Sequence, residues 1–124
     1  MIINGNEVRF CRTVWSNCKM TEAAPDHDLE KFYAKFQSPD VSERYFYAAS
    51  FIVALNEGYE KKHALETGEP PEPLTIDAVL SLEEDDFLTL LNEATEAFKA
   101  DGKRTVNAQP KAVKKTAKSS NPPK

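Results

Sequence analysis

The chain has 124 residues, of which 40% are hydrophobic and 10% aromatic, enough for one domain with a modest core. Its net charge of −4 is unevenly distributed: residues 1–100 hold nine Lys or Arg and nineteen Asp or Glu, and residues 101–124 hold seven Lys or Arg and one Asp. Cys11 and Cys18 exclude a disulfide-rich secreted fold, and no basic-then-apolar signal peptide opens the chain, so we expect a soluble protein of a reducing cytoplasm.

Residues 1–10, MIINGNEVRF, predict a β-hairpin. Two short β-favouring arms, at 2–3 and 8–10, flank Asn4-Gly5, a dipeptide that tolerates the positive φ of a tight turn. Two strands are marginal alone, so the hairpin must pack on the helices or pair with another copy, and we favour packing. The segment 11–20 is ambiguous; it could form one or two helical turns that begin near Thr13 or Ser16.

Residues 28–37 predict a short amphipathic helix. Asp28 is a plausible N-cap, and apolar side chains follow at helical spacing at Leu29, Phe32, Tyr33 and Phe36. We expect this helix to end at Ser38-Pro39, because the residue before a proline avoids the α region.

The stretch from Asp40 to Ala64 predicts a long helix that is apolar on all sides. Asp40 would cap it, with Glu43 at the spacing of a capping box. Between residues 45 and 55 only Ser50 interrupts the aromatic and aliphatic side chains. This run is shorter than the ~20 residues that a membrane-spanning helix needs, so we expect no membrane span. Such a helix must be covered on every side, by its own domain or by another protein.

Two further helices are predicted after a proline linker. Gly68 and the prolines at 70, 71 and 73 would end the central helix and form a semi-rigid connection. A short helix over 75–82 and a longer one over 82–100 follow. Ser81 and Glu84 have the spacing of a capping box, and the acids at 83–86 suit the positive end of a helix dipole. The predicted core stripe of the longer helix is Phe87, Leu91, Ala94 and Phe98, widened by Leu88 and Leu90.

The final segment is basic, rich in Ser, Asn and Pro, and almost without large apolar side chains. It cannot bury enough surface to offset the entropy of ordering, so we predict that it is disordered. The predicted fold is therefore mainly α: a small helical domain over 1–101 with an N-terminal β-hairpin, and a disordered basic tail over 102–124. We expect the helices at 28–37 and 82–100 to provide part of the cover for the central helix.

No catalytic constellation is evident. His27 and His63 are isolated, the acids at 83–86 lack the spacing of a calcium loop, and the glycines are not grouped as in a phosphate-binding loop. Ser50 is better interpreted as bonding a carbonyl one turn back than as a nucleophile. We therefore expect a non-enzymatic protein with no catalytic residues, no cofactor and no metal.

The basic tail leaves a nucleic-acid-associated adaptor as the alternative function, since charge alone supports binding to phosphates. No aromatic residue lies among the lysines of the tail, and the acidic body would repel a polyanion. Nucleic-acid binding is therefore the weaker hypothesis, and a solvated tail that binds a protein partner the stronger one.

The order of segments resembles one known family. The chain opens with IINGNEVRF, continues to an aromatic-rich helix ending in ALNEGYEKK, and then has a proline spacer, PLTIDAVLSLEEDDFLTLLNEATEAFKADGK and a Lys/Pro/Ala tail. In this it resembles the tail assembly chaperones of long-tailed bacteriophages and prophages. The resemblance implies a mostly helical, non-enzymatic protein of the host cytoplasm, absent from the mature virion. The implied partners are the tape measure protein, which is kept soluble, and the major tail protein, whose subunits are recruited.

The resemblance has one further implication. In many such phages a ribosomal frameshift near the end of the gene makes a longer form with an extra C-terminal domain, and the Lys-rich terminus would suit a slippery codon run. A homo-oligomer, as a ring or spiral of subunits, is a hypothesis that we add.

A tape measure is a long, helical, aggregation-prone chain, so covering it requires exposed apolar surface. The central helix would supply that surface in the manner of a helix bound in a groove. The residues predicted to bind partners are its large apolar and aromatic side chains: Tyr45, Phe46, Tyr47, Phe51, Ile52, Leu55 and Tyr59. The same side chains could form the domain core, and for any one of them burial is the better expectation.

Overall fold

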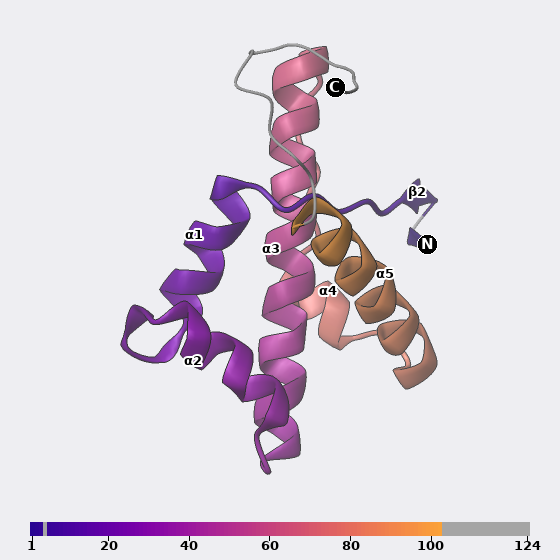
Figure 1. Cartoon of the computed structure of the whole chain (residues 1–124). Coiled ribbons are helices and arrows are strands. Elements are labelled where there is room, and N and C mark those ends of the chain that lie inside the picture. Colours follow the sequence, from indigo (N-terminus) through magenta and orange to yellow (C-terminus); the bar gives the residue numbers. More distant parts are fainter. Residues whose placement is uncertain (4, 103–124) are drawn as a thin grey trace, which may run out of the picture.

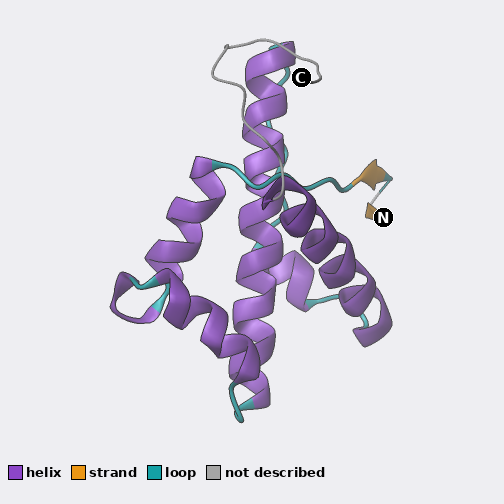
Figure 2. Ribbon diagram, viewed as in Figure 1, coloured by secondary structure: helices purple, strands orange, loops and turns teal. Residues whose placement is uncertain are grey.

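The protein is built around one long helix, α3 (Figure 1). The computed structural model describes residues 1–3 and 5–102, and these form a mainly helical fold with one small hairpin, as predicted (Figure 2). Helices α1 and α2 pack on one flank of α3, and α4 and α5 pack on the other. The elements are β1 (Ile2–Ile3), β2 (Asn6–Glu7), α1 (Val14–Ala23), η1 (Pro25–His27), α2 (Leu29–Ala34), η2 (Lys35–Gln37), α3 (Val41–Thr67), α4 (Ile76–Leu80) and α5 (Glu84–Gly102), where η denotes a 3-10 helix. Residues 103–124 lie outside the described part, so the predicted disordered tail over 102–124 is described only at Gly102, which belongs to α5.

The N-terminal hairpin is shorter than predicted. The strands pair antiparallel with Ile3 opposite Asn6, so the second arm is 6–7 instead of 8–10. Gly5 has a φ of +80°, which the Asn-Gly turn requires. Val8 extends the ladder by donating its N–H to the carbonyl of Met1 at 2.8 Å, and its side chain is buried. The hairpin therefore packs on its own core, as expected.

Helices α1 and α2 begin at residues whose side chains cap them. Thr13 and Ser16 form a capping box: the Thr13 hydroxyl accepts from the N–H of Ser16 at 3.1 Å, and the Ser16 hydroxyl accepts from the N–H of Thr13 at 2.8 Å. The ambiguous segment 11–20 is thus helical from Val14 onward, and the helix continues to Ala23. Asp28 caps α2 by accepting from the N–H of Glu30 at 3.0 Å, as predicted. The chain then tightens into η2 and leaves the helical region at Ser38.

The start of α3 has a cap of three residues. The N–H of Glu43 donates to the Asp40 carboxylate at 3.3 Å, which is the predicted first half of a capping box. The return arm passes through Ser38, whose hydroxyl donates to Glu43 at 2.7 Å and accepts from the N–H of Asp40 at 3.1 Å. At the other end α3 continues three residues beyond Ala64 to Thr67. It stops at Gly68, whose φ of +79° suits a glycine cap.

The N-terminal segment crosses α3 at Gly58. A Cβ at this position would lie 2.6 Å from the carbonyl oxygen of Cys11 and 2.7 Å from the hydroxyl oxygen of Thr13. Nearby, the N–H of Cys11 donates to the carbonyl of Leu55 at 3.0 Å. Only glycine leaves room for this crossing, so Gly58 fixes where the N-terminal segment meets the long helix.

Asn56 ties two distant segments to the same part of α3. Its buried amide donates to the carbonyl of Arg9 at 2.9 Å and accepts from the N–H of Leu74 at 2.7 Å. The Glu60 carboxylate accepts from the N–H of Glu72 at 2.9 Å. The proline-rich connection is therefore held against α3 along its return path.

Helix α5 begins later, and faces the core differently, than the sequence predicts. Ser81 ends α4 by donating its hydroxyl to the carbonyl of Asp77 at 2.7 Å, so the predicted capping box of Ser81 and Glu84 is wrong. The side chains of α5 that are fully covered are Phe87, Leu90 and Ala94, while Leu91 and Phe98 are partly buried and Leu88 is exposed. The stripe is thus centred on Leu90 instead of Leu91.

Candidate functional site: an apolar groove between α3 and α5

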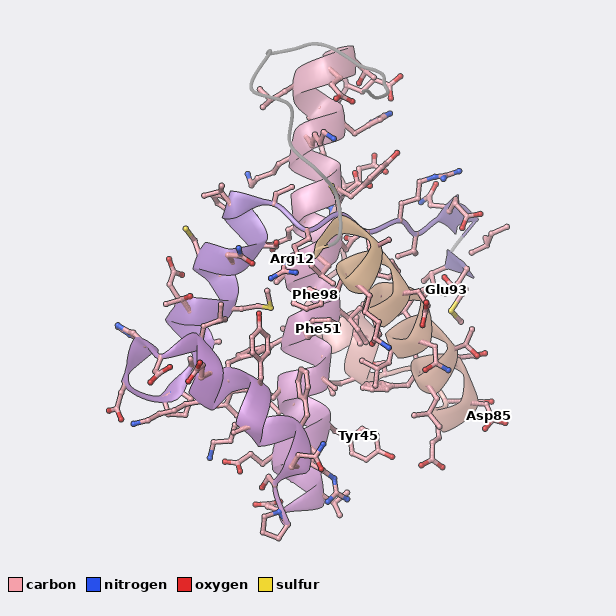
Figure 3. The ribbon with its side chains drawn as sticks, viewed as in Figure 1. Arg12, Tyr45, Phe51, Asp85, Glu93 and Phe98 are labelled. Carbon is pink, nitrogen blue, oxygen red and sulfur yellow. The ribbon has the colours of Figure 1, made fainter. Side chains whose placement is uncertain are left out.

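The flank of α3 that faces α1 and α2 is closed by aromatic side chains, one of which, Phe98, comes from α5. Five rings make a closed circuit of edge-to-face contacts with centroid separations of 5.3–6.0 Å. In order around the circuit they are Phe32, Tyr33, Phe98, Phe51 and Phe36. The guanidinium of Arg12 lies 3.9 Å from the centroid of the Phe98 ring, at the top of this aromatic circuit (Figure 3). This flank is occupied by the protein's own side chains.

Burial leaves one polar group in the aromatic circuit without a partner. The hydroxyl of Tyr33 has no hydrogen-bond partner among the described residues. Desolvation raises the pKa of Tyr33, and the positive charge of Arg12 partly opposes that rise. The hydroxyl therefore stays neutral, and Tyr33 contributes the apolar surface of its ring to the core.

The other flank is open at the first half of α3. A groove of about 370 Å³ lies between residues 41–48 of α3 and residues 87–95 of α5. At its edge, 53% of Val41 and 45% of Leu88 are exposed, and Leu91 is partly buried. The groove is lined by Phe36, Val41, Arg44, Tyr45, Ala48, Phe87, Leu88, Leu91, Asn92 and Thr95. The lining is mainly apolar, with polar groups that could orient a bound segment.

Hydrogen bonds hold the near end of the groove in place. The Tyr45 hydroxyl donates to the Glu84 carboxylate at 2.7 Å, and the Tyr45 ring packs edge-on against Phe87 at 5.3 Å. The bond to this carboxylate raises the pKa of Tyr45. Arg44 donates from Nη1 to the carbonyl of Ser38 at 2.7 Å. Figure 3 shows Tyr45 on α3 close to the start of α5, where Asp85 lies. The walls are thus positioned without a ligand.

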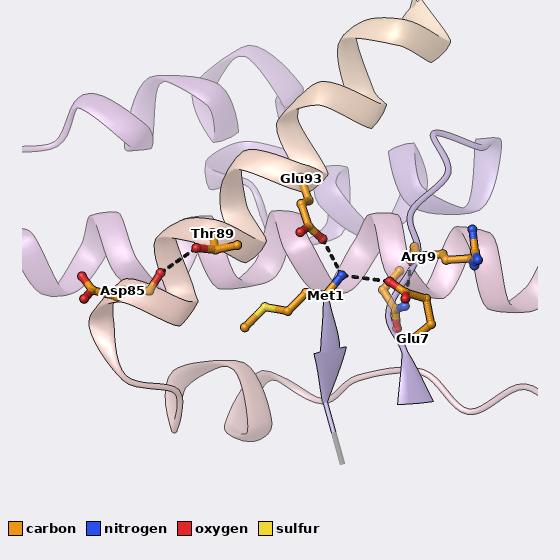
Figure 4. A network of polar contacts seen from close by, with 7 residues as sticks. Met1, Glu7, Arg9, Asp85, Thr89 and Glu93 are labelled. Atoms are coloured by element: carbon orange, nitrogen blue, oxygen red, sulfur yellow. Dashed lines mark hydrogen bonds and ion pairs between the residues drawn. The ribbon is translucent and has the colours of Figure 1, made fainter. Parts of the chain in front are cut away.

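The N-terminus holds the far side of α5. The amino group of Met1 lies 2.9 Å from the Glu93 carboxylate and 2.8 Å from that of Glu7 (Figure 4). Hydrogen bonds to these two carboxylates raise the pKa of the amino group, and the hydrogen bond from this group, together with its positive charge, lowers the pKa of Glu7. Within α5, the Thr89 hydroxyl donates to the Asp85 carbonyl at 3.0 Å. The N-terminus therefore ties the hairpin to α5.

The seven residues predicted to bind partners do not share one surface. Tyr45 lines the groove. Phe46 is 50% exposed and is not part of the groove lining. The ring of Tyr59 stacks on His63 in the second half of α3, with centroids 5.5 Å apart. The remaining four face the protein's own core: Phe51, Ile52 and Leu55 are buried, and Tyr47 is partly buried against Phe32.

The groove also includes residues that the sequence reasoning did not select. Val41 lies before the apolar run of the central helix, and Leu88 and Leu91 were assigned to the core stripe of the last helix. The available signal was that residues 87, 88, 90 and 91 form a wider apolar face than a stripe centred on one row can bury.

The structure adds two observations about other kinds of site. Among residues 1–3 and 5–102, no group of three or more His, Cys, Asp or Glu side chains is placed to hold a metal ion. Within the same part of the chain, no helix combines the length and apolarity that crossing a membrane requires. Comparison with known proteins finds no matching family model, no matching curated protein and no matching solved structure.

Proposed function

We propose that this protein is a non-enzymatic tail assembly chaperone of a long-tailed bacteriophage or prophage, and that it binds the tape measure protein through the groove between α3 and α5. The observation that carries the proposal is the apolar groove itself, which is open and flanked by exposed Val41 and Leu88. The order of the sequence segments supports the proposed family. The groove offers a surface that can bind a helical client and cover its apolar side chains.

The size and chemistry of the groove suit the apolar face of a single helix. Its two walls are themselves helices, and its edges are aliphatic where the groove meets solvent. Each large aliphatic side chain of the client that is fully buried there would contribute about 1.5–3 kcal/mol. Two or three such side chains at i, i+3 and i+4 spacing would hold a client segment reversibly, as a chaperone requires.

The remaining parts of the proposal follow from the family. The protein acts in the host cytoplasm, brings subunits of the major tail protein to the covered tape measure, and leaves before the virion is mature. A longer form made by frameshifting would carry the same groove, because the groove ends at Thr95.

Co-expression tests this function directly. The tape measure protein of the same genome is expressed alone and with this protein, and its soluble fraction and co-purification are measured. We expect a higher soluble fraction and a co-purifying complex. Unchanged solubility together with no complex would contradict the proposal.

A further inference from the structure

A second groove lies at the other end of α3. It has a volume of about 590 Å³ and is enclosed by the hairpin, the second half of α3 and the loop that follows Gly68. Its lining includes apolar surface from Val8, Tyr59 and Leu74. Its charged lining is mostly acidic: the carboxylates of Glu7, Glu60, Glu69 and Glu72, with the guanidinium of Arg9. We call it the acidic groove.

The described contacts leave part of this negative charge uncompensated. Glu7 is paired with the Met1 amino group, and Glu60 accepts from a backbone N–H. Glu69 and Glu72 are exposed at the rim. Neither carboxylate forms an ion pair among the described residues, so both are available to a basic segment.

The end of α3 adds to the same negative potential. The last turn of α3 contains no basic residue, although that is where lysines and arginines are favourable. The terminal carbonyls of a helix carry roughly half a negative charge, and here they lie next to Glu69 in sequence. The C-terminal end of α3 and the exposed carboxylates therefore both add to the negative potential of the acidic groove.

We propose that the acidic groove holds the basic tail of the same chain, residues 103–124. This segment contains seven Lys or Arg and no Asp or Glu, so its charge is opposite to that of the groove. At about 3.3 Å per residue its 22 residues reach about 70 Å, whereas α3, with 27 residues, is about 40 Å long. The tail that leaves α5 at Gly102 can therefore reach the groove from anywhere on the domain.

The tether makes such weak contacts effective. Ion pairs between exposed side chains are individually weak. A covalently linked segment is present at an effective concentration in the millimolar range, so the same pairs hold it far more often than they would hold a free peptide. The acidic groove lies on residues 56–63 of α3 and the apolar groove on residues 41–48, so the tail does not compete for the apolar groove, and this inference does not depend on the proposed function.

Zero-length cross-linking of the full chain tests the proposal. A carbodiimide joins a lysine amine to a carboxylate only where the two are in contact, and mass spectrometry identifies the joined peptides. We expect the tail lysines Lys111, Lys114, Lys115 and Lys118 to join Glu60, Glu69 or Glu72 within one chain. These products should be lost between about 0.01 M and about 1 M salt, where the Debye length falls from about 30 Å to about 3 Å.

The start of α5 is an internal control, because Glu83, Glu84, Asp85 and Asp86 are as acidic as the groove rim but do not line it. Cross-links spread evenly over both acidic regions would overturn the proposal, since charge alone would then explain them. Products that join two chains, with none within one chain, would overturn it as well.

Matched variants give an independent readout. Glu69→Gln with Glu72→Gln removes two charges from the groove, and Asp85→Asn with Asp86→Asn removes two from α5. In amide NMR spectra of the full chain we expect the signals of the tail to shift in the Glu69→Gln, Glu72→Gln double variant. In the Asp85→Asn, Asp86→Asn double variant we expect them to stay in place. Equal shifts in both pairs, or none in the first, would contradict the assignment.

Discussion

The two flanks of α3 are closed to different degrees. On the α1–α2 side, an aromatic circuit that also includes Phe98 of α5 fills the space around Phe51, and the chain crosses α3 at Gly58 with no room for a methyl group. On the α4–α5 side, Leu90 and Ala94 are buried, but the first half of α3 keeps an open apolar groove beside α5.

Under the proposed function, this difference separates residues of α3 that stabilise the fold from residues that bind the client. The aromatic side chains of the closed flank pack in the core and stabilise the protein, and of the circuit only Phe36 also lines the groove. The open side is bounded by exposed Val41 and Leu88. Changes on the first flank should therefore affect stability, and changes on the second should affect binding.

The largest expected effect is on the closed flank. Phe32→Ala removes a completely buried ring at a point where three aromatic contacts meet, and should lower the free energy of unfolding by about 3–5 kcal/mol. Phe46→Ala is the matched control, because half of that ring is already exposed, and should cost about 1 kcal/mol or less. Denaturant unfolding measures both. Equal losses in the two variants would contradict the claim that a ring of the aromatic circuit contributes more to the free energy of unfolding than a half-exposed ring.

A smaller loss is expected where the N-terminal segment crosses α3. Gly58→Ala would place a methyl group 2.6 Å from a backbone oxygen, so either the crossing or the helix must shift, at a cost of about 1–3 kcal/mol. At an exposed helical position the same change usually stabilises by about 1 kcal/mol. A lower thermal stability of Gly58→Ala would support the close contact at this crossing, and a higher one would contradict it.

The cap of α3 should make part of the protein's free energy of unfolding depend on pH. Hydrogen bonds from Ser38 and Lys35 lower the pKa of Glu43 below its ordinary value of 4.5. Because the folded-state pKa is the lower one, this stabilisation is present above the ordinary pKa and is lost as the pH falls through the folded value. Glu43→Gln should remove this component, which comparison of unfolding curves between about pH 6 and about pH 3 would reveal. Parallel curves for the variant and the native chain would contradict it.

The smallest effect on stability is expected in the open groove. Leu88→Glu places a charge on a side chain that is already 45% exposed, so the free energy of unfolding should change by only about 0.5 kcal/mol. A loss comparable to that of Phe32→Ala would show that the groove wall belongs to the core, and the distinction between the two flanks would fail.

Sequence patterns predicted some of the local features. The caps at Asp28 and Asp40 form as expected, with Ser38 added to the second cap, and Gly5 has the positive φ expected of the hairpin turn. The cap at Ser81 and the second arm of the hairpin at 8–10 were wrong, although they too were predicted from neighbouring residues. The contacts of Gly58 and Asn56 could not be predicted in this way. They join α3 to segments more than ten residues away, and nothing in the local pattern identifies those partners.

The candidate site was only partly predictable for a related reason. Because the central helix is apolar around its whole circumference, its sequence does not say which face is left uncovered. That depends on α5, which begins at Glu84 and turns Leu90 inward and Leu88 outward. Tyr45 was predicted from the sequence to bind a partner, and it lines the groove. Val41 and Leu88 also line it, but the sequence did not identify them because their exposure depends on where α5 packs.

The central claim is that the groove between α3 and α5 covers the client. Its most direct test is the soluble fraction of co-expressed tape measure protein with two single variants, Leu88→Glu in the groove and Leu65→Glu outside it. Leu65 is 89% exposed on α3 and is not part of the groove lining, so both variants add the same charge to an exposed leucine. We expect Leu88→Glu to abolish the gain in soluble tape measure protein and Leu65→Glu to retain it. Full activity of Leu88→Glu, with its folding intact, would contradict the claim.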